Sequence, residues 1–242
     1  MLSFFHLIVY QPLYNILIFL YNVIPGRDFG VSIIIITVLL RTILIPLYKK
    51  QIESQKKLQE LQPKIKALQE KTKDDKEQQT KQLMELYKEN KTNPFSGCLP
   101  LIVQLVFLIA IYRVLITISS NGLTIDSSQL YSFITRPDKI NQFFISIVDL
   151  TKPSIVIAAL AAIAQYFQTK MLMGQQQAPI PAASDSSKPD IAQMMNKQML
   201  YLGPFLTLFI GIKFPAGLSL YWLAGTLFML VQQILIQRKS SR

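Results

Sequence analysis

The chain has 242 residues, of which 50% are hydrophobic and only 16% are charged, and its formal net charge is +11 at pH 7. An ordinary soluble domain has roughly a quarter of its residues charged. The charges are also concentrated, because residues 49–91 hold 12 of the 25 Lys and Arg residues and 8 of the 14 Asp and Glu residues. The long apolar tracts that remain are too extensive for a small soluble core, and the single cysteine, Cys98, cannot form an internal disulfide. The composition excludes soluble globular, disordered, collagen-like and disulfide-stapled folds and indicates an integral membrane protein.

Residues 1–28 are predicted to form a helix that lies in the outer membrane interface. The stretch 2–24 is apolar enough to span a bilayer, but Gln11, Asn15 and Asn22 fall on one narrow helical stripe. It lacks the basic start and the small-residue cleavage site of a signal peptide. An interfacial helix is favoured, and a sixth span is the alternative.

Five later segments are long and apolar enough to cross a membrane, which takes about 20 helical residues. The fourth contains Gly203-Pro204 and is expected to be kinked or to extend back through Met194. A tight outer turn at 213–217 makes the last two spans antiparallel neighbours. The predicted fold is an all-α integral membrane protein whose five transmembrane helices cover 29–48, 99–119, 153–173, 197–212 and 218–237.

The segments between the spans set the orientation, because cytoplasmic loops carry more Lys and Arg. With the N-terminus outside and the C-terminus inside, the inner side holds 18 basic residues, counting Lys170 and Lys197 at the inner ends of their spans, and the outer segments hold 5. The outer segment 120–152 is expected near the membrane surface, since its apolar residues cluster at 143–147. The inner segments are the stretch 49–98, a Gln- and Pro-rich loop at 174–196 and a tail at 238–242.

Residues 49–98 are predicted to form a cytoplasmic helical hairpin. The spacing of its apolar residues is that of a coiled-coil seam, with Pro63 expected to bend the first arm. This seam consists of Leu58, Leu61, Ile65 and Leu68, matched by Leu83, Leu86 and Tyr87. A simple linker would be much shorter, so the hairpin is expected to contact a partner; a solvated linker is the alternative.

Arg41 lies in the middle of the apolar run 33–46. It precedes Lys49 by 8 residues, which places it about 12 Å from the inner interface at roughly 1.5 Å per residue. An Arg at the centre of a span costs about 2.5–3.5 kcal/mol and usually pairs with an acid or faces water. No Asp or Glu occurs in any of the five predicted spans. The favoured interpretation is a water-filled recess, open to the cytoplasm, where Arg41 receives an anionic group from another molecule.

Two alternatives stay open for the polar residues of the spans. Arg41 would reach the headgroups by snorkelling only if the bilayer thinned locally, whereas Arg113 lies near the outer surface, where snorkelling is easy. Gln and Thr residues often do no more than hold helices together. Considered with Arg41, however, the polar residues of the spans indicate a shared polar groove. These residues include Gln165, Gln168, Ser219, Thr226, Gln232 and Gln233.

Four stretches together resemble motifs of the YidC membrane-protein insertase family. They are Ile33–Pro46 with Thr37 and Arg41, Leu61–Ile65 in the hairpin, Asn93–Gln104 at the second span, and Phe214–Trp222 at the last span. The resemblance covers nearly all of residues 5–240, and the four motifs come in the order typical of the family.

The resemblance implies five helices around a hydrophilic groove that is open to the cytoplasm and to lipid. Its groove residues carry over as Arg41, Thr37, Gln104, Tyr221 and Trp222, the last standing where many relatives have a second tyrosine. The implied activity is that of an insertase and chaperone of the bacterial plasma membrane. It receives hydrophilic or acidic portions of nascent membrane proteins and releases their apolar helices into lipid.

The expected partners are therefore nascent membrane-protein clients and the lipid bilayer, and the sequence leaves open whether the Sec translocon or the ribosome takes part. No cofactor, metal site, enzymatic activity, nucleotide hydrolysis or specific recognition of nucleic acid is expected. A proton- or ion-coupled transporter would need titratable groups within its spans, whereas the only histidine, His6, lies outside the five. A passive scaffold of a membrane complex is the other alternative, but it would have no need of Arg41.

Overall fold

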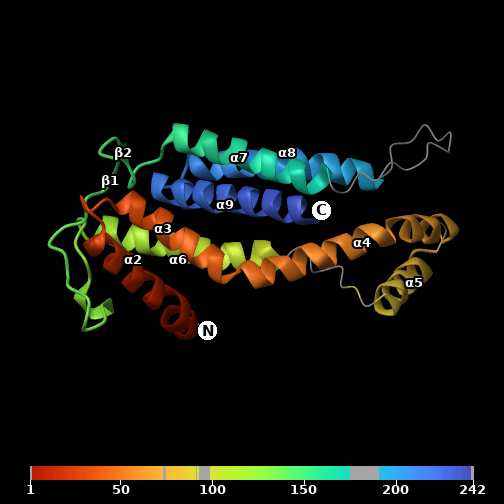
Figure 1. Ribbon diagram of the computed structural model, residues 1–242, viewed down its shortest axis with the longest axis horizontal. Helices are drawn as coiled ribbons and strands as arrows, with labels where there is room; N and C mark the ends of the chain where they lie inside the picture. Colours follow the sequence, from red (N-terminus) through yellow and green to blue (C-terminus); the bar gives the residue numbers. More distant parts are fainter. Residues whose placement is uncertain (1, 73–74, 91, 93–98, 175–190, 241–242) are drawn as a thin grey trace. The chain divides into compact units, whose positions relative to one another are not determined.

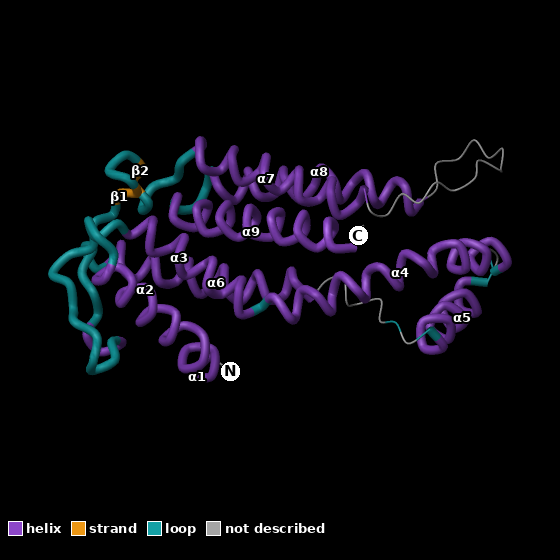
Figure 2. Tube along the Cα trace, viewed as in Figure 1, coloured by secondary structure: helices purple, strands orange, loops and turns teal. Residues whose placement is uncertain are grey.

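The computed structural model describes residues 2–72, 75–90, 92, 99–174 and 191–240 (Figures 1 and 2). Parts of four predicted segments lie outside these residues: the hairpin turn at 73–74, the motif residues 93–98, most of the loop 174–196 and the end of the tail. The chain divides into two compact units, one of Met1–Thr42 with Phe107–Arg242 and one of Ile43–Val106.

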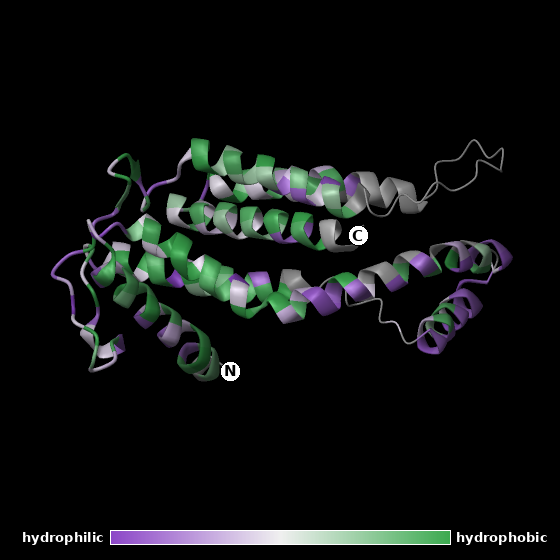
Figure 3. Cartoon of the chain, in the orientation of Figure 1, coloured by the Kyte–Doolittle hydropathy of each residue, from purple (hydrophilic) through white to green (hydrophobic). Residues whose placement is uncertain are grey.

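The described chain is mainly helical, as expected for an all-α membrane protein. Helix α1, the π-helical turn η1 and α2 follow one another from Leu2 to Val23, and among the described residues two strands of two residues each form a hairpin. Figure 3 shows apolar residues dominating α7 and α9 and polar residues dominating α5. The elements are α1 Leu2–Phe5, η1 His6–Tyr10, α2 Gln11–Val23, α3 Phe29–Ile43, α4 Ile45–Lys71, α5 Lys76–Glu89, α6 Leu99–Ser120, η3 Ser127–Gln129, β1 Phe143–Phe144, β2 Val148–Asp149, α7 Ile155–Gly174, α8 Ile191–Gly211 and α9 Ala216–Ser240.

Three helices are long and apolar enough to cross a membrane, over Ile102–Ser120, Ile155–Leu172 and Ala216–Ile236. A fourth span is formed if α3 and the beginning of α4 are counted together. The apolar part of α8, Leu200–Gly211, is shorter than a typical span, although α8 itself runs without a break through Pro204. The described residues thus contain three to four spans by length and composition, and a fifth stays a prediction.

The first predicted span, 29–48, is not one straight helix. The axis bends by 56° between Phe29–Ile43 and Ile45–Ser54. The cause is Pro46, which has no N–H to donate to the carbonyl of Thr42 and whose ring clashes with that carbonyl. The predicted span 29–48 therefore contains a break, three residues after Arg41.

The second unit contains α4 and α5, which pack against each other. The Asp75 carboxylate caps α5 by accepting hydrogen bonds from the N–H groups of Glu77 and Gln78. Leu61 and Ile65 of the predicted seam are buried, and the remaining seam residues are half-buried. Helix α4 continues through Pro63 as one element rather than ending there. Burial of the predicted seam explains why these two helices pair.

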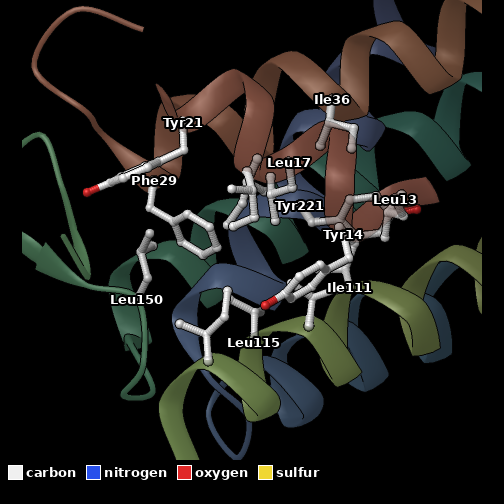
Figure 4. Packing of buried hydrophobic residues seen from close by; sticks show 14 of the residues in the cluster. Leu13, Tyr14, Leu17, Tyr21, Phe29, Ile36, Ile111, Leu115, Leu150 and Tyr221 are labelled. Carbon is white, nitrogen blue, oxygen red and sulfur yellow. The ribbon is translucent and has the colours of Figure 1, made fainter. Parts of the chain in front are cut away.

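The first unit has a hydrophobic core that joins α2, α3, α6 and α9 (Figure 4). Tyr14 and Leu17 of α2 are fully buried in it, as are Ile36 of α3 and Ile111 of α6. Helix α9 comes close to α6 at Gly217, where an added Cβ would lie 2.9 Å from Leu115. Helix α7 packs along both α8 and α9.

The polar stripe of the N-terminal helix holds the outer segment in place. Asn15 is only 1% exposed; its side-chain amide donates to the carbonyl of Gln129 over 2.8 Å and accepts from the N–H of Tyr131 over 2.7 Å. Asn22 donates to the carbonyl of Thr135 over 2.7 Å. The stripe that predicts an interfacial helix is thus used for contacts within the protein, while the membrane position of this helix stays a prediction.

The strands β1 and β2 form an antiparallel hairpin with a strained turn. Ile145 and Ser146 have φ angles of 50° and 58°, and the N–H of Ile147 donates to the carbonyl of Phe144 over 3.0 Å. Positive φ at both central residues defines a type I′ turn, which normally contains Asn and Gly. A β-branched residue there is unfavourable by about 1–2 kcal/mol. Asp28 stabilises the turn, because one of its carboxylate oxygens accepts from the N–H of Ile145 while the other caps α3 by accepting from Val31.

The end of this hairpin is joined to the first turn of α9. The N–H groups of Ala216 and Gly217 donate to the carbonyls of Lys152 and Leu150 over 2.8 and 3.0 Å. Burial alone would raise the pKa of the Asp149 carboxyl, but hydrogen bonds from Thr151 and Lys152 outweigh it and lower that pKa below its ordinary value. At pH values above the ordinary pKa of an aspartate, the Asp149 carboxylate therefore stabilises the fold. This contribution is lost as the pH falls through the lowered pKa.

Replacing Asn15 with Leu is expected to release the outer segment from α2. The substitution keeps the side-chain size but leaves the Tyr131 N–H without its partner and the Gln129 carbonyl with only the longer, 3.5 Å bond from Gln11. An unsatisfied buried group costs about 1–3 kcal/mol. Thermal unfolding in detergent and limited proteolysis of residues 120–152 would measure the loss. Ile16→Ala, on the exposed side of the same helix, is the control. Equal resistance to protease in both variants would show that the Asn15 contacts do not hold the segment.

Candidate functional site

Arg41 lies in the last turn of α3, and its side chain reaches α9. The guanidinium Nη1 is 3.4 Å from the sulfur of Met229, and the residue is only 4% exposed. A Cβ added at Gly225 would lie 2.9 Å from Nη2 and 3.2 Å from Nε of Arg41. The guanidinium therefore lies directly against the backbone of α9, in space that any side chain at residue 225 would fill.

Helix α9 presents further side chains at helical spacing on the side that meets α7. The indole N–H of Trp222 donates to Oε1 of Gln165 over 3.2 Å, and the hydroxyl of Thr226 reaches the same oxygen over 3.5 Å. One turn further along, the amide of Gln168 donates to the sulfur of Met229 over 3.3 Å. We call this set the polar seam; it consists of Gln165 and Gln168 of α7 and Trp222, Thr226, Met229 and Gln233 of α9.

Met229 connects the polar seam to Arg41, because its sulfur accepts from both Arg41 and Gln168. A thioether sulfur is a weak acceptor on a flexible side chain. On either side of Met229 along α9, Ser219 Oγ and Gln233 Nε2 are buried and make no hydrogen bond within the described part of the chain. A buried polar atom without a partner is unfavourable unless water or a bound molecule supplies one. The seam thus combines weak and unsatisfied polar groups beside a fixed positive charge.

The residues predicted for the groove fall in different surroundings. Thr37 is fully buried and donates to the carbonyl of Ile33, one turn earlier in α3. Tyr221 packs in the hydrophobic core (Figure 4), whereas Trp222 belongs to the polar seam. Gln104 is half-buried and belongs to the second unit, so its proximity to Arg41 stays a prediction.

The sequence reasoning missed two residues of the site, Gly225 and Met229. Both are ordinary in an apolar span, and neither carries chemistry of its own. A signal was nevertheless present, because residues 219, 222, 226, 229 and 233 follow the 3- and 4-residue steps of one helix face. Within the described ranges, no group of three His, Cys, Asp or Glu residues could hold a metal ion.

These features define an all-helical, multi-span membrane protein that keeps a charged side chain next to a polar helix–helix contact. The model of the family described as "60Kd inner membrane protein" matches residues 19–242, and the chain belongs to this family.

Curated relatives support the assignment. The chain is 35% identical to the membrane protein insertase YidC of Fusobacterium nucleatum over 96% of this chain and 98% of that protein. It is 31% identical to the membrane protein insertase MisCA of Bacillus subtilis over 88% of this chain and 72% of that protein. It is 30% identical to YidC of Streptomyces avermitilis over 89% of this chain, and it spans 52% of that longer relative.

Replacing Gly225 with Leu is expected to push the Arg41 guanidinium out of its place. Overpacking of this kind destabilises a protein by about 1–3 kcal/mol. Thermal unfolding in detergent measures the effect, and the same substitution in an Arg41→Met background should cost less. Two residues in contact are expected to show a coupling of about 0.5 kcal/mol or more in such a cycle.

Gly203→Ala is the matched control, because a Cβ there meets only Nε2 of Gln165, at an ordinary distance of 3.8 Å. It should keep or slightly raise the stability, because Ala favours a helix interior more than Gly does. Additive effects of Gly225→Leu and Arg41→Met would contradict the packing of Arg41 against Gly225.

Proposed function

We propose that this protein is a membrane-protein insertase that receives hydrophilic or acidic portions of nascent membrane proteins at Arg41 and the polar seam. The apolar helices of these clients then pass sideways into lipid, and no nucleotide is hydrolysed. The observation that carries the proposal is the buried guanidinium at the α3–α9 contact, beside weakly bonded polar groups. The names of the relatives, membrane protein insertases YidC and MisCA, support the same function.

Arg41 would act by attracting negative charge into the membrane. Opposite charges interact far more strongly where the dielectric constant is low than they do in water. A client carboxylate that meets Arg41 regains part of the solvation that it loses on leaving water. The membrane potential adds about 2.3 kcal/mol per charge per 100 mV for acidic tails that move outward.

Met229 would give way when a client arrives. Hydrogen bonds between a guanidinium and a carboxylate are charge-assisted and often bidentate, so they are stronger than a contact with a thioether. A client carboxylate can therefore replace the sulfur at Nη1. Gln168 would be released by the same movement, because it donates to the same sulfur. The buried Ser219 and Gln233 atoms would supply further polar contacts.

The apolar part of a client would meet the exposed apolar side chains of α7 and α9. These include Leu160, Ile163 and Phe167 of α7 and Leu227 and Val231 of α9. Lipid tails and an apolar helix are interchangeable neighbours for such side chains, since neither offers hydrogen bonds. Release into lipid therefore needs no large change in free energy.

The finer arrangement that we propose has five spans around a hydrophilic groove that opens to the cytoplasm. The N-terminus lies outside and the C-terminus inside the bacterial cell membrane, with the N-terminal helix in the outer interface and the α4–α5 hairpin in the cytoplasm. The asymmetry of Lys and Arg between the two sides supports this orientation. Neither the Sec translocon nor the ribosome is required for the electrostatic step.

Arg41→Ala is expected to impair insertion of a single-span client with an acidic N-terminal tail. Cells depleted of the native insertase, with protease protection of the tail as the readout, provide the measurement. Arg41→Lys should retain much of the activity because it keeps the charge, although it loses the planar fork of the guanidinium. A client whose tail carries Asn in place of Asp should depend less on residue 41.

Arg113→Ala is the matched control, since Arg113 is exposed on α6 and lies 5.7 Å from the ring of Phe5. It should insert the acidic client normally. Normal insertion by Arg41→Ala, at normal protein levels and for several acidic clients, would refute the proposed role of Arg41.

Deletion of residues 53–88 is expected to impair insertion while the spans stay in the membrane. The deletion removes the buried Leu61 and Ile65 contact together with the helix cap at Asp75, so the whole hairpin is lost as a unit. Alkaline extraction of membranes checks that the spans remain, and the same acidic client reports activity. Unchanged insertion would show that α4 and α5 serve only as a linker.

A further inference from the structure

The turn between β1 and β2 exposes two large apolar side chains. Ile145 is 60% exposed and Ile147 is 79% exposed. Ile145 also adopts a backbone conformation that is unfavourable for a β-branched residue. A polar residue such as Asn would suit both the conformation and contact with water. The presence of an exposed isoleucine in this strained conformation is therefore explained better if Ile145 contacts an apolar environment rather than water.

Contacts with neighbouring elements fix the position of this turn relative to the helices. The N–H of Ile145 donates to Asp28, directly before α3, and an added Cβ at Gly30 would clash with Phe144. The turn thus lies beside the first turn of α3 rather than beyond the end of that helix. Residues 150–152 are bonded to the start of α9, and α7 begins at Ile155 (Figure 1). The hairpin is therefore attached where three membrane helices begin.

Exposed basic residues lie at the same level. Arg27, Lys152 and Lys213 each precede the first residue of α3, α7 or α9 by two or three positions, and all three are exposed. Cations at the ends of spans suit the negatively charged phosphates of lipid headgroups. Directly below the headgroup layer, toward the middle of the bilayer, a side chain is surrounded by lipid acyl chains.

We propose that the β1–β2 turn is a membrane anchor that inserts Ile145 and Ile147 among the lipid acyl chains next to the first turn of α3. In the proposed orientation this is the outer leaflet. Arg27 and Lys213 bind headgroup phosphates above it, together with Lys152, whose ammonium also pairs with Asp149 over 3.3 Å. The anchor follows from the membrane class of the protein and is independent of the insertase function.

The test uses the full-length chain with Cys98→Ser, so that an introduced cysteine is the only one. Ile147→Cys is labelled with an environment-sensitive fluorophore and reconstituted into vesicles of phosphatidylcholine and phosphatidylglycerol. Lipids that carry a nitroxide near the glycerol end of the acyl chain serve as the quencher. We expect several-fold stronger quenching than for the same label at Asp138→Cys, an exposed polar site of the same outer segment.

Asp28→Asn tests the attachment of the turn. Asn still offers an oxygen to cap α3 but replaces the second acceptor, so the turn should loosen and quenching of the label at residue 147 should fall. If Ile147→Cys does not yield folded protein, Ile145→Cys carries the label instead.

Equal quenching at residues 147 and 138 would overturn the anchor. A second combination of results would also overturn the anchor. In it, lipid nitroxides do not quench the label in vesicles, yet the label is shielded from water-soluble quenchers in native membranes. That result would show that the turn docks onto another protein. Neither result bears on client insertion, so the anchor and the insertase function fail separately.

Discussion

The position of Arg41 depends on the lack of a side chain at Gly225. The guanidinium fits against α9 only because residue 225 is a glycine, which brings the charge onto the helix backbone instead of leaving it between bulky apolar groups. In lipid a charge tolerates few surroundings, so the residues beside it are restricted to those that leave room or offer lone pairs. Gly225 does the first and Met229 does the second. The site therefore depends on the room left by Gly225 as much as on the acceptor offered by Met229.

The polar seam shows how the same contacts can join helices and still exchange partners. Gln165 accepts from Trp222, and Gln168 donates to Met229, across the contact between α7 and α9. Hydrogen bonds between helices in membranes contribute only about 0.6 kcal/mol on average. Bonds of that strength hold two helices in contact but are easily replaced by a better partner. A seam made of Gln, Thr and Met is suited to repeated opening, which a buried ion pair would resist.

Hydropathy and charge counts are enough to predict a helical membrane protein, the helical arms of the hairpin and the unusual position of Arg41, because each depends on residues close in sequence. The motifs are also enough to predict the family. The bend at Leu44 is visible in the sequence as Pro46, but a count of apolar residues does not detect it. Gly225 is different, since its role exists only when α3 and α9 meet. Asn15 likewise finds its partners more than a hundred positions away, where local spacing carries no information.

The hydrogen bonds that the N-terminal helix makes to the outer segment all go to main-chain groups of that segment. Tyr14 accepts from the N–H of Asp126, Tyr21 accepts from that of Asn141, and Asn15 and Asn22 bond to carbonyls between them. Every amino acid offers the same carbonyl, and every one except proline offers the same N–H. These hydrogen bonds therefore place no demand on the side chains of the outer segment, whose fixed positions are instead the buried Ile125, Ile140 and Leu150. The exposed side chains of the segment can thus be exchanged while the four residues of the helix keep the course of its backbone.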